Sequence, residues 1–312
     1  MEQDWDVAIV LDACRYDFFK EFYRYFFDGT LKKAISRGSC TPEWFRNTFT
    51  SFYKDTVYIS ANPFINSLNI KIAGCRAKSR FAQVVDVWNH FWDPLLGTVL
   101  PQSVNRALLD VLDAKGGKRL IAHYLQPHAP YISPRYFVVG FPTPELSSGR
   151  VLQGISRNGG SGVSRRLNKP LAAIGKIAMK LGLGIGLVLR VRDALNLPPL
   201  SPLDATRRVH GVRGLRRAYA ENLLVVLETL TFVLDGLDGR VVITSDHGEF
   251  LGERSMFSHP CGVRDPILTH VPYFVVKSVK KPAEPKFSRY PLKLRLKLVM
   301  AKSHGGPIGR VR

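Results

Sequence analysis

Short apolar runs alternate with helical patterns along this chain, and this alternation constrains its fold more than any other feature of the sequence. Residues 7–11 (Val-Ala-Ile-Val-Leu) form an apolar run bounded by polar residues, which is typical of a buried strand in a parallel sheet. Similar runs predict further strands at 56–60, 119–124, 240–244 and 273–276. Helical periodicity falls between the strands, at 16–27, 102–114 and 215–234. The alternation predicts an α/β fold, a three-layer sandwich around a mostly parallel central sheet.

The charge of the chain is unevenly distributed. In total, 45 Lys and Arg stand against 25 Asp and Glu, a formal net charge of +20. Residues 149–217 contain 14 basic and 2 acidic side chains, a local charge of +12, and residues 277–312 contain 11 and 1, a local charge of +10. We expect a near-neutral body from which two basic segments project to contact an anionic membrane or polymer. Solvated segments without a partner fit this distribution equally well.

The domain organisation follows from composition along the chain. We expect one large domain over residues 1–276, interrupted at about 140–214 by a basic, flexible insertion rich in Gly, Ser and Arg. A basic C-terminal extension should follow at 277–312. Alternating charged and apolar side chains at 293–298 predict a half-exposed strand in that extension.

The start of the chain and its cysteines bear on location. The sequence opens with an acidic segment rather than a basic and apolar signal, and it contains no run of about 18 uncharged apolar residues. Cys14, Cys40, Cys75 and Cys261 lack the spacing of a disulfide scaffold or a zinc ribbon. We therefore expect a soluble, cytoplasmic protein, peripheral at the membrane surface where its basic segments bind lipid.

Polar residues follow two of the predicted strands at the point where each strand ends. Asp12 comes directly after the first strand, and Asp246 and His247 follow the strand at 240–244. Ligand sites in parallel sheets lie beyond the carboxyl ends of the strands, so we expect these side chains to converge there. A carboxylate and an imidazole suit zinc, manganese or a similar ion. Taken alone, Asp12 is explained equally well as a helix N-cap.

Three motifs resemble those of the alkaline phosphatase superfamily, in the same order along the chain. They are Val-Leu-Asp-Ala-Cys-Arg-Tyr-Asp at 10–17, His-Tyr-Leu-Gln-Pro-His-Ala-Pro-Tyr at 123–131 and Thr-Ser-Asp-His-Gly-Glu at 244–249. Within that superfamily the chain is similar to the sulfatase-like branch, and in particular to short archaeal sulfatase-type proteins. The resemblance covers roughly 1–135 and 215–276. It implies a catalytic domain that transfers or hydrolyses sulfate or phosphate esters.

The resemblance implies a metal centre and its ligands. Asp12, Asp246 and His247 match the metal-binding positions of the family, and the nucleophile, here Thr41, completes the set. The carboxylates of a second site are missing, because Ala13 follows the first aspartate and Gln126 stands in the central motif. We therefore expect one divalent ion, which could be Zn, Mn, Mg or Ca.

The nucleophile of the family lies at the start of a helix as Cys, Ser or Thr. Cys40 occupies the Cys-x-Pro position of true sulfatases, in which the cysteine is oxidised to formylglycine, but Trp44 replaces the arginine of that motif. Thr41 is favoured on physical grounds, since a metal ion lowers the pKa of a hydroxyl and a helix N-terminus stabilises the resulting charge. Thr41 could also simply cap the helix, with Pro42 at its first position. We rank Thr41 as nucleophile first, the cap second and Cys40 third.

Further candidates bind the substrate or assist the reaction. His128 is similar to the substrate-binding histidine of sulfatase-like enzymes. His259 lies where relatives carry a His or Lys near the transferred group, and it could protonate the leaving oxygen, although a histidine with no role beyond its loop fits as well. Arg15 could bind a sulfate or phosphate with its guanidinium fork. We expect His123 to be structural.

These residues predict a metal-dependent hydrolase or transferase that acts on an anionic sulfate or phosphate ester through a hydroxyl nucleophile. The alternative is a non-catalytic member of the family that binds an anionic polymer or membrane surface, but such a protein has no need of the predicted ligand set. No specific nucleic-acid binding is expected, because no nucleic-acid module occurs and few aromatic residues interleave with the basic ones.

Overall fold

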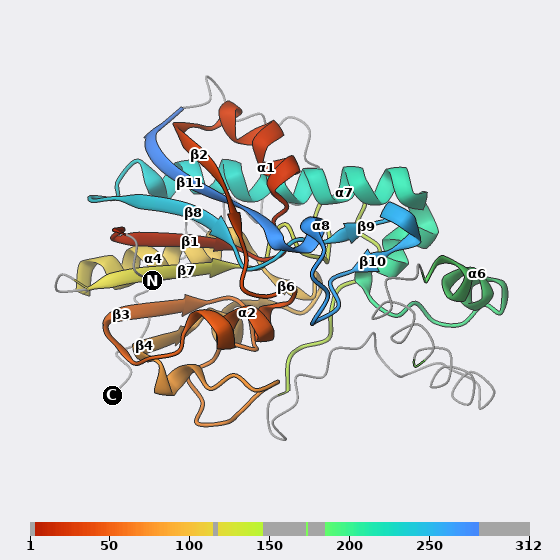
Figure 1. Cartoon of the computed structure of the whole chain (residues 1–312), viewed down its shortest axis with the longest axis horizontal. Helices are drawn as coiled ribbons and strands as arrows, with labels where there is room; N and C mark the ends of the chain where they lie inside the picture. Colours follow the sequence, from red (N-terminus) through yellow and green to blue (C-terminus); the bar gives the residue numbers. More distant parts are fainter. Residues whose placement is uncertain (1–3, 115–117, 146–172, 174–184, 281–312) are drawn as a thin grey trace.

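The computed structural model describes residues 4–114, 118–145, 173 and 185–280, and its centre is a seven-stranded sheet (Figure 1). The strand order is β2-β11-β8-β1-β7-β3-β4. The strands are β1 (Val7–Leu11), β2 (Phe27–Ile35), β3 (Tyr53–Ser60), β4 (Phe81–Asp86), β7 (Arg119–Tyr124), β8 (Val241–Ser245) and β11 (His270–Val279). All pairings are parallel except those of β11, which is antiparallel to β2 and β8. The predicted α/β fold with a mostly parallel sheet is confirmed.

Helices cover both faces of the sheet, which makes the three layers (Figure 1). The main helices are α1 (Tyr16–Phe22), α2 (Thr41–Thr48), α4 (Pro101–Ala114) and α7 (Pro202–Leu234). Val7, Ile9 and Leu11 of β1 pack into a core shared with α1, α4 and α7, whereas Ala8 and Val10 pack into a second core with α2. Side chains alternate between the faces of a strand, so this central strand must be apolar throughout.

The remaining elements are short, and most of them follow the carboxyl ends of β4 and β8 along the chain. They are α3 (Val87–Phe91), β5 (Trp92–Asp93), β6 (Thr98–Val99), β9 (Phe250–Leu251), β10 (Phe257–Ser258) and α8 (Pro266–Thr269), with 3-10 turns at Tyr23–Tyr25, Ala77–Ser79 and Glu253–Ser255. The helix predicted at 16–27 is shorter than expected, because α1 ends at Phe22 and Phe27 begins β2. Within the described residues, no helix combines the length and apolarity needed to cross a membrane.

The described part of the insertion expected at 140–214 differs from the flexible appendage that its composition predicts. Helix α6 (Gly186–Ala194) and the first turns of α7 lie within it. Ile185, Leu189 and Leu203 are buried against Tyr219 in a separate apolar cluster. The expectation that residues 149–217 stay outside the hydrophobic packing is therefore wrong for the part from 185 onward.

The predicted boundary at residue 277 also needs correction. Strand β11 continues to Val279 and pairs with β2 along its length, so the sheet extends past the expected domain end. The strand predicted at 293–298 and the Gly- and Ser-rich stretch at 156–166 lie outside the described residues.

Candidate metal centre and active site

Asp12, Asp246 and His247 converge at the carboxyl edge of the sheet, as the sequence predicts. Asp12 follows β1 and Asp246 follows β8, and these two strands are parallel neighbours. One ligand atom from each of the three side chains lies within 4.8 Å of the others, and all three residues are buried. We call these residues the Asp12 cluster. Two residues separated by most of the chain meet because neighbouring parallel strands end at one edge.

Two hydrogen bonds join the ends of these strands and orient the carboxylates. The turn after β1 places Ala13 in the left-handed region, with φ of 60°, and its N–H donates to Asp246 Oδ1 at 3.0 Å. The N–H of Cys14 donates to the Ser245 hydroxyl at 2.8 Å. Each strand end therefore fixes the turn of the other, and the side chains of Asp12 and Asp246 are held on the same side of the sheet edge.

Thr41 approaches this cluster from α2, which covers the face of the sheet opposite to α1, α4 and α7. It is the first residue of α2, with Cys40 as N-cap and Pro42 next. Its Oγ1 donates to Asp246 Oδ2 at 2.7 Å and lies 3.3 Å from His247 Nε2. Cys40 rather than Thr41 is the N-cap of α2, and the Thr41 hydroxyl bonds to Asp246 instead, so the alternative in which Thr41 only caps the helix finds no support. The hydroxyl faces the cluster.

The donor atoms of the Asp12 cluster suit a divalent ion. His247 Nδ1 is 2.9 Å from the Gly248 carbonyl oxygen and donates to it in the neutral ring, which leaves the Nε2 lone pair facing Asp246 Oδ2 at 3.3 Å and Asp12 Oδ1 at 3.6 Å. Asp12 Oδ1 is buried and has no hydrogen-bond partner among the described residues. Two carboxylates, one imidazole and the Thr41 hydroxyl form an N and O donor set of the kind that binds Zn or Mn.

The electrostatics of the cluster point the same way. Burial and the nearby charge of Asp246 raise the pKa of Asp12 well above its usual range. Burial lowers the pKa of His247 to about 4, so its imidazole is neutral at physiological pH and available as a ligand. Two buried carboxylates next to a neutral histidine leave negative charge uncompensated, and a bound cation would compensate it.

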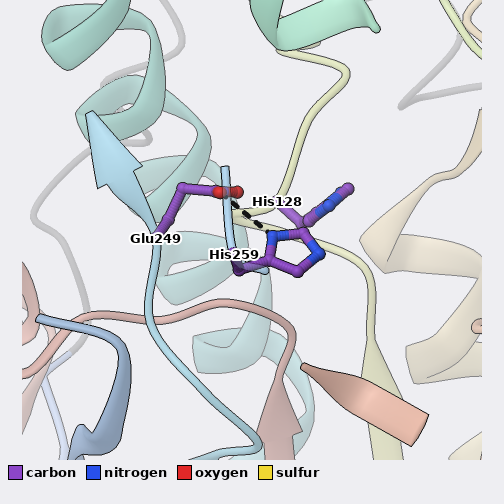
Figure 2. Close-up of side chains that lie close together, drawn as sticks. All are labelled: His128, Glu249 and His259. Carbon is purple, nitrogen blue, oxygen red and sulfur yellow. Dashed lines mark hydrogen bonds and ion pairs between the residues drawn. The ribbon is translucent and has the colours of Figure 1, made fainter. Parts of the chain in front are cut away.

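A second group of titratable residues, His128, Glu249 and His259, lies beside the first, and we call it the Glu249 cluster (Figure 2). His259 Nδ1 lies 3.0 Å from Glu249 Oε1, and its ring is 4.4 Å from that of His247, centroid to centroid. Burial opposes the charge of both partners, but their ion pair outweighs it, lowering the pKa of Glu249 and raising the pKa of His259. This cluster could hold an ion too, but its histidine already supplies a cation.

Glu249 was not among the sequence candidates, and two other residues were also missed or undervalued. Asn62 Nδ2 donates to Asp12 Oδ2 at 2.8 Å, but an asparagine in a loop gives no signal in the sequence. His123, expected to be structural, lies on β7 with Nε2 3.8 Å from Asp246 Oδ2. Burial lowers its pKa to about 4, and Nε2 has no hydrogen-bond partner among the described residues. Glu249 could have been found, because it ends the Asp-His-Gly-Glu motif.

Arg15 does not lie where the sequence prediction requires. Its guanidinium is buried and forms paired hydrogen bonds with Asp17, at 3.0 and 2.6 Å, and one with Glu253 at 2.8 Å. It also donates to the backbone carbonyl oxygen of Glu249 at 3.2 Å. These acceptors use most of its donors, so the prediction that Arg15 binds the substrate anion is wrong. Arg15 instead ties α1 to the segment around β9.

Cys40 forms a disulfide with Cys261, and their Cα atoms are 5.1 Å apart. This bond occupies the thiol that the Cys40 alternative requires for oxidation to formylglycine. The structure therefore contradicts Cys40 as a nucleophile. Spacing along the sequence did not reveal the pair, because 221 residues separate the two cysteines.

A pocket adjoins the two clusters. Its polar lining consists of Asp12 from the first cluster, His128 and His259 from the second, and the neighbouring Thr41 and Asn62. The rest of its wall is apolar and is formed by Pro63, Phe64, Trp92, Leu125, Ala129, Phe141, Pro142 and Pro144. Convergent polar groups on the floor of an apolar pocket are typical of a small-molecule or ester-binding site.

Comparison with known proteins gives likenesses of structure only. No protein-family model and no curated protein sequence matches the chain. The soluble domain of lipooligosaccharide phosphoethanolamine transferase A from Neisseria meningitidis is 15% identical with a TM-score of 0.48, over 86% of this chain and 75% of that domain. The phosphonate monoester hydrolase of Agrobacterium radiobacter is 13% identical with a TM-score of 0.45, over 88% of this chain and 68% of that one.

A sulfatase gives a similar result. A putative sulfatase from Bacteroides thetaiotaomicron is 11% identical with a TM-score of 0.44, over 99% of this chain and 73% of that one. The chain spans only 47% of the integral membrane form of the Neisseria transferase. The solved structures found in this comparison thus include phosphoethanolamine transferases, a phosphonate monoester hydrolase and sulfatases.

The expected cytoplasmic location is wrong. Phosphoethanolamine transferase domains from Campylobacter jejuni and Escherichia coli, which this chain resembles in structure, are periplasmic. The Cys40–Cys261 disulfide of this chain gives the physical reason, because such bonds form and persist in oxidising compartments and are rare in a reducing cytosol. The cysteines have no diagnostic spacing, so no local pattern predicts the bond.

Proposed function

We propose that this protein is a metal-dependent hydrolase or transferase that acts on a phosphate or sulfate ester through the hydroxyl of Thr41. The observation that supports this most strongly is the convergence of Thr41 Oγ1 with the Asp12 cluster on the floor of the pocket. A hydroxyl held at a helix N-terminus among a buried carboxylate pair and a neutral imidazole is arranged for nucleophilic attack on an anionic centre.

The metal ligands in this proposal are Asp12, Thr41, Asp246 and His247. One divalent ion, bound there, would lower the pKa of the threonine hydroxyl and neutralise charge on the transferred group. Asn62 orients Asp12 through its hydrogen bond to Oδ2. The Gly248 carbonyl oxygen orients His247 through Nδ1, so both ligands have the supporting contacts that metal sites require.

The first chemical step forms a bond between Thr41 Oγ1 and the phosphorus or sulfur and breaks the bond to the departing alcohol. Thr41 donates its hydroxyl proton toward Asp246 Oδ2, the acceptor at 2.7 Å. The departing oxygen takes a proton from His259. The charge of Glu249 and its hydrogen bond raise the pKa of His259 despite burial, which favours the imidazolium that this step needs.

The second step releases the group from Thr41. Neutral His259 takes a proton from water or from an acceptor alcohol, which attacks the same phosphorus or sulfur and displaces the threonine oxygen. The threonine oxygen recovers its proton from Asp246 Oδ2, which accepted it in the first step. Attack by water makes the protein a hydrolase, and attack by an alcohol makes it a transferase. The apolar pocket wall, which includes Trp92 and Phe141, would receive the organic part of the ester.

His128 is proposed to contact the substrate, although not as a cation. Burial is the main cause that lowers its pKa, with a smaller effect from the nearby His259. Its Nδ1 lies 2.5 Å from the Ala129 carbonyl oxygen and donates to it in the neutral ring, so Nε2 carries the lone pair. His128 would therefore accept a hydrogen bond from a hydroxyl or ammonium group of the substrate.

Turnover by the metal-loaded protein tests the proposal. We would measure release of nitrophenol from bis(4-nitrophenyl) phosphate, 4-nitrophenyl phosphate and 4-nitrophenyl sulfate, with Thr41→Ala and Thr41→Ser as matched variants. We expect turnover of at least one ester, none with alanine and partial turnover with serine. Equal rates for the wild type and the alanine variant would refute the role of Thr41.

A second proposed function concerns the basic helices of the insertion. Arg190, Arg213 and Arg217 are exposed on α6 and α7, and so are apolar side chains, with Leu195 51% and Val209 62% exposed. Exposed basic and apolar side chains together favour the surface of an anionic membrane, to which each basic residue adds about 1 kcal/mol. This contact would hold the protein at a membrane that contains its substrate.

Vesicle flotation tests the membrane contact. We expect binding to vesicles that contain phosphatidylglycerol, weaker binding at high salt, and less binding by an Arg213→Glu/Arg217→Glu variant. Vesicle binding that does not depend on salt, or equal binding by the wild type and the variant, would refute the proposed membrane contact of these helices.

A further inference from the structure

The first turn of α2 is bonded to the segment that follows His259. Cys40, which precedes Thr41, forms the disulfide with Cys261. On the preceding residue, the Ser39 hydroxyl lies 2.9 Å from the Pro260 carbonyl oxygen and can donate to it. One helix end is thus linked, covalently and by hydrogen bonding, to the two residues after His259.

Glu43, in the first turn of α2, adds further contacts to the same segment. Its Oε2 accepts hydrogen bonds from the N–H of Gly262 at 3.1 Å and from the N–H of Ser39 at 2.9 Å. The N–H of Val263 donates to the Ser39 hydroxyl at 3.2 Å. Burial raises the pKa of Glu43, but these backbone donors outweigh it and lower the pKa overall, so the carboxylate stays ionised at neutral pH.

The segment needs such contacts because it has no secondary structure of its own. Residues 259–265 form neither helix nor strand, between β10 and α8. His259 is held on one side by Glu249, through the 3.0 Å contact to its Nδ1. The contacts from α2 hold the other side of the segment, and they come from the residues that flank Thr41.

We propose that Ser39, Cys40 and Glu43 form a clasp on residues 260–263 that positions His259 relative to Thr41. The inference rests on the proposed function, in which Thr41 attacks and His259 protonates the departing oxygen. Thr41 and His259 come from distant parts of the sequence, and the clasp fixes the backbone on which one lies relative to the backbone of the other. The clasp residues do not line the pocket, so their proposed role is that of positioning residues.

A disulfide that closes a loop of this length also stabilises the fold whatever else it does. Removing it should lower the melting temperature under either explanation, because the unfolded chain gains freedom. Stability is therefore not the deciding measurement. A positioning role predicts a fall in kcat with KM and metal content preserved, since a misplacement of about 1 Å can cost about 100-fold in rate.

The deciding variant is Cys40→Ala/Cys261→Ala, assayed well below its melting temperature. We expect kcat to fall about ten- to hundredfold, with KM and bound metal close to wild type. Glu43→Gln, which keeps the disulfide, should lower kcat by a smaller factor. An unchanged kcat in the double variant would overturn the clasp while leaving the proposed function intact. Loss of metal in parallel with kcat would also overturn it, because the bond would then only support the fold.

Two further measurements keep the inference testable where the double variant folds poorly or the substrate is a poor one. Cys261 is exposed, so dithiothreitol should slow the wild-type enzyme, and the double variant controls for any effect of the dithiol on the metal. Hydrogen exchange should rise at residues 256–264 of the reduced wild type and stay unchanged in β1 and β7. No rise at 256–264 would contradict the clasp without reference to activity. A wild type inactive on all three nitrophenyl esters would overturn the proposed function and, with it, the clasp.

Discussion

The Asp12 cluster and the Glu249 cluster both consist of carboxylates and histidines, and they lie side by side. They differ in how the negative charge of their carboxylates is balanced. In the first, two carboxylates face each other beside His247, whose pKa burial lowers to about 4. In the second, Glu249 is the only carboxylate and pairs with His259. The charge of Glu249 raises the pKa of His259, although burial alone would lower it. The first cluster requires a cation from outside, whereas the second contains its own.

This difference assigns distinct tasks to neighbouring groups. A neutral histidine next to uncompensated carboxylates suits metal binding, and a protonated histidine held by a carboxylate suits proton donation. Pairs of titratable groups whose surroundings move their pKa values apart are typical of enzyme sites. The predictions below disturb one cluster at a time.

The largest effect should come from the nucleophile of the Asp12 cluster. Thr41→Ala should lower kcat by at least about 10⁴-fold, because no other hydroxyl in the pocket lining can form the covalent bond. Thr48→Ala, in the last turn of the same helix, is the matched control and should leave the rate nearly unchanged. Steady-state kinetics on a nitrophenyl ester decides between them, and a similar loss in both variants would indicate damage to α2.

The next effect belongs to the Glu249 cluster. Glu249→Gln should lower kcat by about 100-fold at neutral pH, because His259 loses the charge that keeps it protonated. The pKa of His259 should then fall, so the high-pH limb of kcat/KM should move to lower pH. Glu253→Gln, in the same segment, is the control and should leave the limb in place. A limb that stays in place in Glu249→Gln would show that His259 is not the acid.

Loss of a residue that orients a proposed metal ligand should have a smaller effect on activity. Asn62→Ala removes the hydrogen bond to Asp12 Oδ2 and should weaken metal affinity by about 10–100-fold. Activity should return when metal is added in excess. Asn66→Ala is the control, since Asn66 is buried in the same loop and bonds to Pro63 rather than to a proposed ligand. Equal losses of affinity would show that the loop, and not the hydrogen bond, matters.

Arg15 lies outside both clusters and should affect stability rather than chemistry. Arg15→Gln breaks the ion pairs with Asp17 and Glu253 and should cost about 1.5–3 kcal/mol in the free energy of unfolding. Denaturant unfolding measures that loss. The KM for the anionic ester should stay at the wild-type value, and a large rise in KM would restore the abandoned substrate-binding role.

The parts of the site that sequence could predict are those fixed by strand ends. Val7–Leu11 and Arg119–Tyr124 are apolar runs with no competing pattern, and the predicted strands match β1 and β7 residue for residue. The positions of Asp12 and Asp246 follow from those ends and from the sheet. By contrast, β2 was missed because most of its residues are exposed and polar on the edge of the sheet, so no apolar run marks it.

The remaining parts depend on contacts between distant segments. Whether Arg15 binds substrate or a neighbouring carboxylate depends on where Glu253 folds back, which no local pattern records. The Cys40–Cys261 bond and the contact of Asn62 with Asp12 are of the same kind. Composition also predicts a projecting basic segment at the start of α7, which is wrong. The arginines there form ion pairs with Asp193 and Asp204.

Metal content per chain tests the central claim most directly. Purified wild-type protein, Asp246→Asn and Glu249→Gln would be loaded with zinc, dialysed and analysed by mass spectrometry of the bound metal. We expect one ion per chain in the wild type, none in Asp246→Asn and one in Glu249→Gln, since only the Asp12 cluster lacks a cation of its own. An ion retained in Asp246→Asn and lost in Glu249→Gln would contradict the account and assign the metal to the other cluster.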